Sequence, residues 1–597
     1  MIIQPRFQDY PNKIVHEIGK TVRVPDFKNY FGGKSGGKAG GLEFFRYALL
    51  ENEARLKDEF SGRVFFACPK TSVLQTELFV EFMEKNKLWA AVASGMPDEM
   101  LVQTFLKAQF TPAQRAVFNT IINDCEEGHV RPIVVRSSSL NEDAERAAFA
   151  GIYKSVMLPN CHPDPEVRLA QFEAAVKLVY ASMFSNAAHE YRRDKKIPEG
   201  GEQMAVLVQN MAGRLWRTMD GGQIYHPEVA FAAFSFNDFP LGDVKAEDGV
   251  ARIALGLGPG VVDGDNKMAI RVNLGKPDPP AGMLDWRQTL RIAPEMLYAM
   301  ELNGSAELPT GENFYLKKIP YGKHSNQEMI LQYCRWFDGF DTIWDTERGE
   351  NASPVAMFHR LLRGLHGNSF VKVLRTTNDI LKAYFGTNVD FEGAADFIRD
   401  QYNKYYSVIY VLQARSQIRG DMGRVKELPD VAPEKLVLRA QGAAGKGSQK
   451  FRFIAHVPPE EFNSGTSWRL GQDLGSVNKD FKGAEGDGRY LLLAPGRFGS
   501  SDLGLGIKGD FGTISNSVGI GEFMQGNWEP SQGAHMFEDM IGTGKALFSY
   551  KGEQLSMENL AKLAVSTRKA GGITIYEFAE PLELLIDDAG GLLVHSP

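Results

Sequence analysis

Two polar segments in the first quarter of the chain carry residue types that bind phosphate. The first is the glycine-rich run FGGKSGGKAGG at 31–41, which contains Lys38. Glycines let backbone N–H groups approach a phosphate closely, and a lysine neutralises its charge. The run nearly fits the P-loop pattern, but Ala39 stands where that pattern has a hydroxyl to hold Mg²⁺. The sequence therefore predicts phosphate chemistry without a true P-loop, and a plain surface turn is the alternative.

The second segment is VVRSSSLNEDAERAAFAGIYKSV at 134–156, where a short buried strand runs into a polar loop. The strand delivers Arg136 and Ser137 to the start of that loop. An arginine binds phosphate oxygens through two N–H groups at once, and serine hydroxyls add further donors. The segment indicates a second set of phosphate ligands, and the alternative is an arginine–carboxylate pair that only holds the loop in place.

Residues of the same kind recur in the last fifth of the chain. RYLLLAPGRFGSSDLGLGI at 489–507 is a strand that enters a glycine and serine loop, and EPSQGAHMFEDM at 529–540 precedes a helix. Glycines, hydroxyls and an arginine are typical of anion sites. The candidate residues for an acceptor site are Arg497, Ser500, Ser501, Ser531 and His535. His535 is also a candidate base or phosphoryl carrier, and two purely structural turns are the alternative.

Composition narrows the class of protein that holds these segments. A length of 597 residues indicates about two to four domains, and a net charge of -7 argues against a dedicated nucleic-acid binder. The cysteines are Cys68, Cys125, Cys161 and Cys334. They form no CxxC pair, which argues against a disulfide framework or a structural zinc site. The sequence has no apolar leader and no run of about 20 apolar residues, so we expect a cytoplasmic enzyme without membrane partners.

Hydrophobic patterning predicts the elements that must position these residues. A long amphipathic helix spans 165–195, and the segments 285–305 and 353–385 are largely helical. SVIYVLQAR at 407–415 is a strongly β-prone run. RGDMGRVKELPDVAPEK at 419–435 is polar and contains proline, so it predicts a linker. Strands and helices occur on both sides of this linker, which predicts the α/β (α+β) class.

Taken in order along the chain, these segments resemble the ATP-binding domain of the phosphoenolpyruvate synthase and pyruvate phosphate dikinase family. The resemblance covers residues 30–417, about two thirds of the chain. The matching motifs are Gly36-Gly37-Lys38, PKTSVLQTELF (69–79), Arg136-Ser137-Ser138, Glu142-Asp143, Phe149-Ala150-Gly151, YASMFSNAAHEYR (180–192), VLVQNM (206–211), Phe234-Ser235-Phe236-Asn237, GLGPGVVDG (256–264), VDFEGA (389–394) and YVLQARSQ (410–417). Pro259 and Ser416 depart from the family pattern, and insertions lengthen 265–385.

The resemblance implies a two-lobed, ATP-grasp-like nucleotide-binding domain followed by a smaller C-terminal α/β domain. The implied divisions are an N-terminal arm at 1–30, lobe 1 at 31–202, lobe 2 at 203–418, the linker at 419–435 and the C-terminal domain at 436–597. The implied ATP-binding residues are Lys38, Arg136, Ser137, Gln209, Gly256, Gly258, Glu392, Gln413 and Arg415. Among them, Glu392 and Gln413 are the implied Mg²⁺ ligands. Lys38, Arg136 and Arg415 are the implied catalytic residues, which act on the transferring phosphates.

Two parts of the family's dikinases are not found in this sequence. None of the 11 histidines lies in the context of the family's phosphorylated histidine. About 160 residues follow position 435, too few for a phosphoenolpyruvate barrel of about 250. The prediction is an ATP- and Mg²⁺-dependent phosphotransferase acting on a small molecule or a separate phosphocarrier protein, with ADP or AMP as product. A non-catalytic ATP sensor or scaffold and an ATP-grasp ligase are the alternatives, and the acceptor and the oligomeric state are left open.

Overall fold

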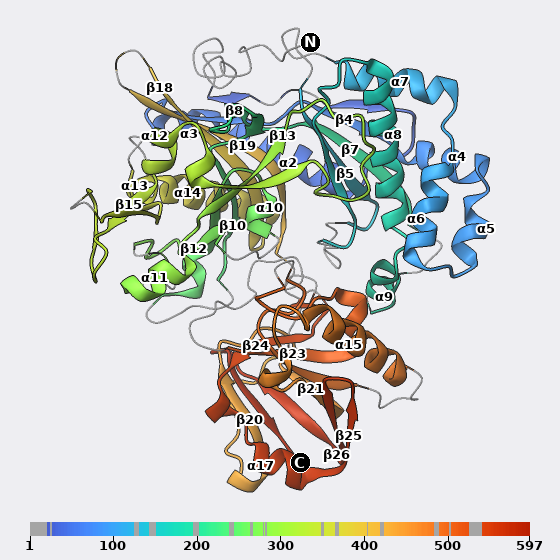
Figure 1. Ribbon diagram of the computed structural model, residues 1–597, viewed down its shortest axis with the longest axis vertical. Helices are drawn as coiled ribbons and strands as arrows, with labels where there is room; N and C mark the ends of the chain where they lie inside the picture. Colours follow the sequence, from blue (N-terminus) through green and yellow to red (C-terminus); the bar gives the residue numbers. More distant parts are fainter. Residues whose placement is uncertain are drawn as a thin grey trace.

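The computed structural model describes most of the chain. The segments outside the description are 1–20, 24, 26, 125–130, 143–150, 195–196, 198–201, 238–243, 263–266, 279, 281–282, 284, 348–350, 365–368, 401, 403, 418–422, 483–488, 501–502, 525–539 and 542. Figure 1 shows a large body formed by the blue to yellow part of the chain and a smaller orange to red unit formed by its C-terminal part. None of the described helices is long and apolar enough to cross a membrane.

The largest described sheet of the body combines N-terminal strands with strands from the middle of the chain. Its order is β1 (Val22–Arg23), β3 (Val64–Ala67), β19 (Tyr405–Ser416), β18 (Val389–Arg399), β10 (Val229–Phe234), β11 (Val250–Leu255) and β12 (Ala269–Asn273). The nearby helices are α2 (Gly37–Glu51), α3 (Glu53–Glu59) and α14 (Phe370–Phe385). Because α2 packs on β19 and α14 packs on β18, both strands are buried along most of their length.

The β18–β19 pair aligns the polar residues expected in the site. Glu392 lies opposite Gln413, and Asp390 lies opposite Arg415. A β-bulge between Glu392 and Gly393 shifts the register of the pairing. Such bulges re-aim side chains and are common beside functional sites. Residues two apart on a strand share a face, so Asp390 and Glu392 lie on one face of β18.

A second described sheet lies on the other side of the body (Figure 1). Its order is β2 (Lys28–Tyr30), β4 (Thr71–Leu74), β7 (Met204–Asn210), β5 (Ile133–Ser139) and β6 (Ser155–Leu158). Its helices are α4 (Thr76–Lys85), α5 (Leu88–Ala93), α6 (Asp98–Lys107), α7 (Pro112–Ile122), α8 (Pro165–Ser182) and α9 (Asn186–Asp194). α8 is buried along most of its length because α6, α7 and β5 pack around it. The helix predicted at 165–195 is therefore two helices with a short break.

Strand pairing crosses the boundary predicted between residues 202 and 203 in two places. β7 begins just after that boundary but pairs with β4 and β5, which come before it. β3, from the segment before the boundary, pairs in parallel with β19. Each of the two sheets therefore contains chain segments from both predicted lobes.

Two smaller sheets of described strands extend the body. One has the order β14 (Leu316–Pro320), β13 (Met296–Glu301), β9 (Gln223–His226) and β8 (Arg214–Arg217), and the other β16 (Ile343–Trp344), β15 (Cys334–Phe337) and β17 (Ser353–Ala356). The short helices here are α10 (Pro259–Val262), α11 (Trp286–Ile292), α12 (Gln327–Leu331) and α13 (His359–Arg363). The prediction of helix is wrong at 296–301 and 353–356. Short apolar runs do not distinguish helix from strand, and here cross-strand partners decide.

The C-terminal unit is built on a mixed sheet of described strands. Its order is β20 (Leu436–Gln441), β27 (Gly591–His595), β26 (Ile573–Ile586), β21 (Ser448–His456), β22 (Tyr490–Pro495), β23 (Ser517–Phe523) and β24 (Ala546–Tyr550), with β25 (Ala564–Ala570) also paired to β26. Its helices are α15 (Ser467–Lys482) and α17 (Met557–Leu563). β21 to β24 run parallel, and β22 is buried throughout, as expected of a central parallel strand. The predicted mixed α/β class is confirmed.

The C-terminal unit meets the body at α9 and the short 3₁₀ helix η7 (Phe511–Ile514). The rings of Tyr191 and Phe511 meet edge to face, with centroids 5.5 Å apart. Lys545 Nζ pairs with Asp194 Oδ2 at 3.0 Å and also donates to two backbone carbonyls of its own unit. This interface combines apolar contact with an ion pair whose lysine is buried, so it fixes where the unit sits against the body.

Candidate functional site

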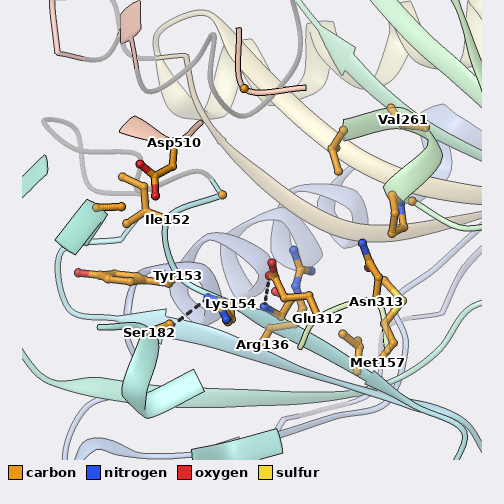
Figure 2. A pocket seen from close by; sticks show the side chains of 18 of the residues that line it. Arg136, Ile152, Tyr153, Lys154, Met157, Ser182, Val261, Glu312, Asn313 and Asp510 are labelled. Carbon is orange, nitrogen blue, oxygen red and sulfur yellow. Dashed lines mark hydrogen bonds between the residues drawn. The ribbon is translucent and has the colours of Figure 1, made fainter. Parts of the chain in front are cut away.

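Residues of the body and of the C-terminal unit line one cavity. Its volume is about 1140 Å³, which is large enough for a nucleotide and a second small substrate. Residues from α2, β5, β7, β18, β19 and the turn before α10 line it from the body. Residues from α15 and from the segment 497–513 line it from the C-terminal unit. Figure 2 shows this cavity from close by, with lining side chains from several elements converging on it.

The glycine-rich run ends against β5, where a glycine is required for a close approach. Gly36 has a φ of 77°, and a Cβ added to it would lie 1.7 Å from the carbonyl oxygen of Ser138. Any other residue would force the two backbones apart. Ser138 Oγ accepts a hydrogen bond from Ala39 N at 3.1 Å and donates one to Ser35 O at 2.8 Å. The first turn of α2 is therefore fixed on β5, which sets the position of Lys38.

Lys38 lines the cavity but already has partners. Its Nζ lies 2.6 Å from Glu142 Oε1 and donates to Ser137 Oγ at 3.1 Å. Glu142 is fully buried and accepts further hydrogen bonds from Ser137 Oγ at 2.9 Å and Ser139 N at 3.1 Å. An ion pair therefore does hold this loop, with Lys38 rather than Arg136 as its cation. Ser137 acts through this pair and is not among the described lining residues.

Arg136 joins the two large sheets of the body across the cavity. Its Nη2 donates to Gln413 Oε1 at 2.5 Å, and its Nη1 donates to Leu412 O at 3.0 Å. Nη1 also lies 3.4 Å from Gln209 Oε1, and Nη2 lies 3.7 Å from Glu392 Oε2. Predicted site residues that are more than 250 positions apart in the chain thus form one group of contacts.

Arg415 is held by a carboxylate to which the motif comparison assigned no role. Its Nε donates to both carboxylate oxygens of Asp390, each at 3.0 Å, and both residues are buried. Arg415 lines the cavity, and Asp390 is not among the described lining residues. Asp390 stands two positions before Glu392, so the period of two along a strand was the signal that points to it. The pair fixes the direction of the guanidinium before any ligand arrives.

Glu392 and Gln413 offer two oxygen ligands to a hard cation. No group of three or more His, Cys, Asp or Glu side chains among the described residues could hold a metal by itself. Mg²⁺ commonly uses one or two protein oxygens and completes its shell with water and substrate phosphates. The guanidinium of Arg136 lies against the side chains of Glu392 and Gln413, so the oxygens of these two residues already contact a cation. The residues therefore fit Mg²⁺ that enters with a phosphate substrate.

The two glycines predicted to bind ATP, Gly256 and Gly258, have different roles in the turn before α10. Gly256 has a φ of 84°, and a Cβ added to it would lie 2.3 Å from Tyr298 O. Leu257 N donates to the same carbonyl at 2.9 Å, which ties this turn to β13. Gly258 lines the cavity, and a Cβ added there would meet nothing within 4 Å. Gly256 shapes the turn and is not a described lining residue, whereas Gly258 leaves the start of α10 open to a ligand.

Glu312 enters the cavity from the loop between β13 and β14, and no sequence spacing pointed to it. Its Oε1 accepts a hydrogen bond from Ser155 N at 2.8 Å. Burial raises the pKa of the Glu312 carboxyl, and the Ser155 hydrogen bond and the charges of Lys154 and Lys38 oppose that rise. Figure 2 shows Glu312 and Lys154 in the same part of the cavity as Arg136. This corner therefore mixes a carboxylate with several cations.

The C-terminal unit supplies the remaining wall of the cavity. Arg497 and Ser500 both line it, as does the ring of Trp468 from α15. Arg497 N donates to Leu505 O at 2.8 Å, so the loop that carries both residues closes on itself. The structure brings these two predicted acceptor residues to the same cavity as Arg136. Ser501, Ser531 and His535 lie outside the described residues, and their roles stay predictions.

Comparison with known proteins finds a family match for the body, and this match ends before the C-terminal unit. The family model of the pyruvate phosphate dikinase AMP/ATP-binding domain matches residues 34–435. An uncharacterized phosphotransferase of Bacillus subtilis (strain 168), YvkC, is 27% identical over 143 residues. That alignment covers 24% of this chain and 16% of the Bacillus protein, so the chain matches well under two thirds of that relative's length.

Proposed function

This chain belongs to the family of the pyruvate phosphate dikinase AMP/ATP-binding domain, and on that basis we propose that it transfers a phosphoryl group from ATP to an acceptor inside the cavity. The resemblance drawn from the motifs is confirmed, since the family domain supports ATP binding and the distant relative is named a phosphotransferase. The observation that carries the proposal is that residues of the ATP motifs and residues of the C-terminal unit line the same cavity.

In this proposal the ATP phosphates lie against Lys38, Arg136 and Arg415. Lys38 and Arg136 exchange their present carboxylate and amide partners for phosphate oxygens, with which cations form strong hydrogen bonds. Arg415 keeps its bond to Asp390, which holds its guanidinium in a fixed direction. In the loose transition state of phosphoryl transfer, charge spreads over the phosphate oxygens. Cations that are already oriented stabilise that charge without reorganising.

Glu392 and Gln413 are the residues that we expect to hold Mg²⁺ next to the same phosphates. When bound, Mg²⁺ neutralises phosphate charge and orients the transferring group. Gln209 and Gly258 complete the body side, because both line the cavity and Gln209 Oε1 lies 3.4 Å from Arg136 Nη1. The acceptor enters from the side of Arg497 and Ser500, either as a small molecule or as part of a separate phosphocarrier protein.

The first experiment is to measure ATP binding by calorimetry and ATP turnover by nucleotide chromatography, with Mg²⁺ and a metabolite pool. We expect binding, and consumption of ATP to ADP or AMP that stops when Mg²⁺ is chelated. Binding without turnover would make the chain a sensor or scaffold. Release of ADP and phosphate only when two co-substrates are present would indicate a ligase. Absence of ATP binding in folded protein would refute the proposal.

Arg415→Ala separates an enzyme from a sensor. We expect turnover to fall by about 10³-fold or more, because this arginine acts on charge that develops in the transition state. The Kd for ATP is expected to rise far less. Because the variant leaves Asp390 buried without its partner, the double variant Arg415→Ala/Asp390→Asn controls for misfolding, and thermal unfolding of all three proteins is compared.

A further inference from the structure

The part of the cavity that faces the C-terminal unit lies beyond the family match, so the family assigns it no ligand. Its wall consists of residues from one face of α15 and from 497–500 and 508–513. The described charged residues of this wall are Lys479, Arg497, Lys508 and Asp510. Three of these described residues are cations and one is an acid, so this wall carries net positive charge.

Lys508 has a firmly positioned backbone. Its N donates to Ser467 Oγ at 3.0 Å, and that hydroxyl donates to Gly506 O at 2.7 Å. A Cβ added to Gly471 would lie 1.9 Å from Lys508 O, which shows how closely α15 packs on this segment. Because the backbone is already fixed, binding a ligand through the ammonium orders fewer groups.

The ammonium groups of Lys508 and Lys479 have no carboxylate within ion-pair distance in the part of the chain that the structure describes. The described acid of the same wall is engaged elsewhere, because Asp510 Oδ1 accepts from N and Oγ1 of Thr513 at 2.9 and 2.8 Å. Asp98, on the body side, accepts from the backbone N–H at the start of α9 at 3.1 and 3.2 Å. A cleft wall with cations of this kind raises the local concentration of anions.

We propose that this wall binds an anionic group, a carboxylate or a phosphate, on the phosphoryl acceptor through Lys508 and Lys479. Trp468 lines the same space and is 58% exposed, so its ring offers the carbon skeleton of the acceptor a surface on which to pack. The acceptor is then a small hydroxy acid or phosphate ester whose hydroxyl faces the ATP phosphates. The inference rests on the proposed function, because it takes the bound anion to be the acceptor.

The transfer step balances as follows for such an acceptor. The bond between the leaving oxygen of the nucleotide and the transferred phosphorus breaks while the acceptor oxygen forms a bond to that phosphorus. The hydroxyl proton passes to water, and the nucleotide leaves with the negative charge of the broken bond. The anionic group that Lys508 and Lys479 hold takes no part in this exchange and serves only to position the hydroxyl.

The test compares three series of hydroxyl compounds as acceptors for the full-length protein with Mg-ATP. Glycerol and glucose form the neutral series, glycerate and gluconate the carboxylate series, and glycerol 3-phosphate and glucose 6-phosphate the phosphate series. We expect at least one charged series to raise ATP consumption about tenfold above the neutral series, the effect of one charge-assisted bond. The series that responds identifies whether the anion is a carboxylate or a phosphate.

Variants of the wall then test the residues. Lys508→Ala and Lys479→Ala are each expected to raise the KM for the charged acceptor about tenfold, with a smaller fall in kcat. Lys569→Ala, an exposed lysine on β25 outside the cavity lining, is the matched control and leaves both constants unchanged. A rate with neutral compounds equal to that with charged ones, no stimulation by either charged series, or an unchanged KM in both wall variants overturns the inference. The proposed function fails separately, if no compound of the metabolite pool supports ATP consumption.

Discussion

The two sides of the cavity hold their cations in different ways. On the body side, Lys38 is paired with the fully buried Glu142, and Arg415 is paired with Asp390 across a strand pair. On the C-terminal side, Lys508 has no carboxylate partner among the described residues. The body side is therefore organised before a ligand arrives, whereas the C-terminal side carries positive charge that a ligand would neutralise.

This difference follows from the elements that carry the residues. The body side is built from paired strands, and a charge buried between sheets is costly unless a counter-charge and hydrogen bonds satisfy it. The C-terminal side is built from one helix face and a loop, where a partly exposed lysine stays solvated at little cost. We therefore expect the first side to fix the geometry of one constant substrate and the second to select a substrate by its charge.

The largest effect that tests this comparison is expected from Arg136→Ala. This arginine contacts Gln413 and the carbonyl of Leu412, so its loss removes both a phosphate ligand and the link between the two sheets. We expect kcat/KM for ATP consumption to fall by about 10³-fold. Arg136→Lys is expected to restore little, because an ammonium does not reproduce the two-pronged geometry of a guanidinium.

Steady-state kinetics with chromatographic detection of nucleotides measures this loss. Arg439→Ala, an exposed arginine on β20, is the matched control. If the Arg136→Ala protein keeps activity within tenfold of the wild type, the body side does not work as a preorganised phosphate site.

A smaller effect is expected from a substitution at the interface between the body and the C-terminal unit. Lys545 is buried at the interface and pairs with Asp194, so Lys545→Met keeps much of the volume and removes the charge. Breaking a buried pair from one side costs about 3 kcal/mol. Calorimetric unfolding is expected to show a loss of that size for the contact between the unit and the body, with Lys569→Met as control. Turnover with an acceptor falls more than ATP affinity, and an equal fall of both would contradict the division of roles.

The smallest effect that we expect is a loss of stability of the body at acidic pH. His226 and His324 form a buried pair with Nε2 atoms 3.2 Å apart. Burial, with the neighbouring His324, lowers the pKa of His226 to about 3 from the usual 6.5, and burial also lowers the pKa of His324. The unfolded chain therefore protonates His226 near pH 6.5, whereas the folded chain keeps it neutral down to about pH 3. The contribution of His226 to stability is fully present above pH 6.5 and falls by about 1.4 kcal/mol per pH unit below it, and His324 adds to this loss in the same direction.

Unfolding of the body and of the C-terminal unit between pH 7.5 and about 5 checks this expectation. The C-terminal unit contains one described histidine whose burial lowers its pKa, His456, so its pH slope is expected to be shallower. The double variant His226→Gln/His324→Gln is expected to flatten the slope of the body alone. Equal slopes for the body and the C-terminal unit in the wild type would contradict the account.

Much of the body side was predictable because its residues lie in short motifs with a fixed period. Lys38 follows a glycine pair, Arg136 follows an apolar run, and Gln413 and Arg415 stand two apart on a β-prone run. The same period also points to Asp390, which comes two positions before Glu392 and was missed. The period of two does not predict the register of the strand pairing, which places Asp390 opposite Arg415.

The cavity residues that the sequence did not predict lie on loops and on a segment that packs against a helix. Glu312 comes from the loop between β13 and β14, and the first of these strands was predicted to be helical. Its position depends on a hydrogen bond to Ser155, more than 150 residues earlier, which no local pattern encodes. Lys508 reaches the cavity because its segment packs on α15 near Gly471. Contacts of this kind depend on tertiary packing and not on periodicity.

A structure of the protein with Mg²⁺ and a non-hydrolysable ATP analogue tests the central claim most directly. The account predicts the β- and γ-phosphates within hydrogen-bonding distance of Lys38, Arg136 and Arg415, with Mg²⁺ at Glu392 and Gln413. It also predicts that the γ-phosphate faces the part of the cavity that Lys508 lines. An analogue bound outside this cavity, or one whose γ-phosphate points away from the C-terminal unit, would contradict it.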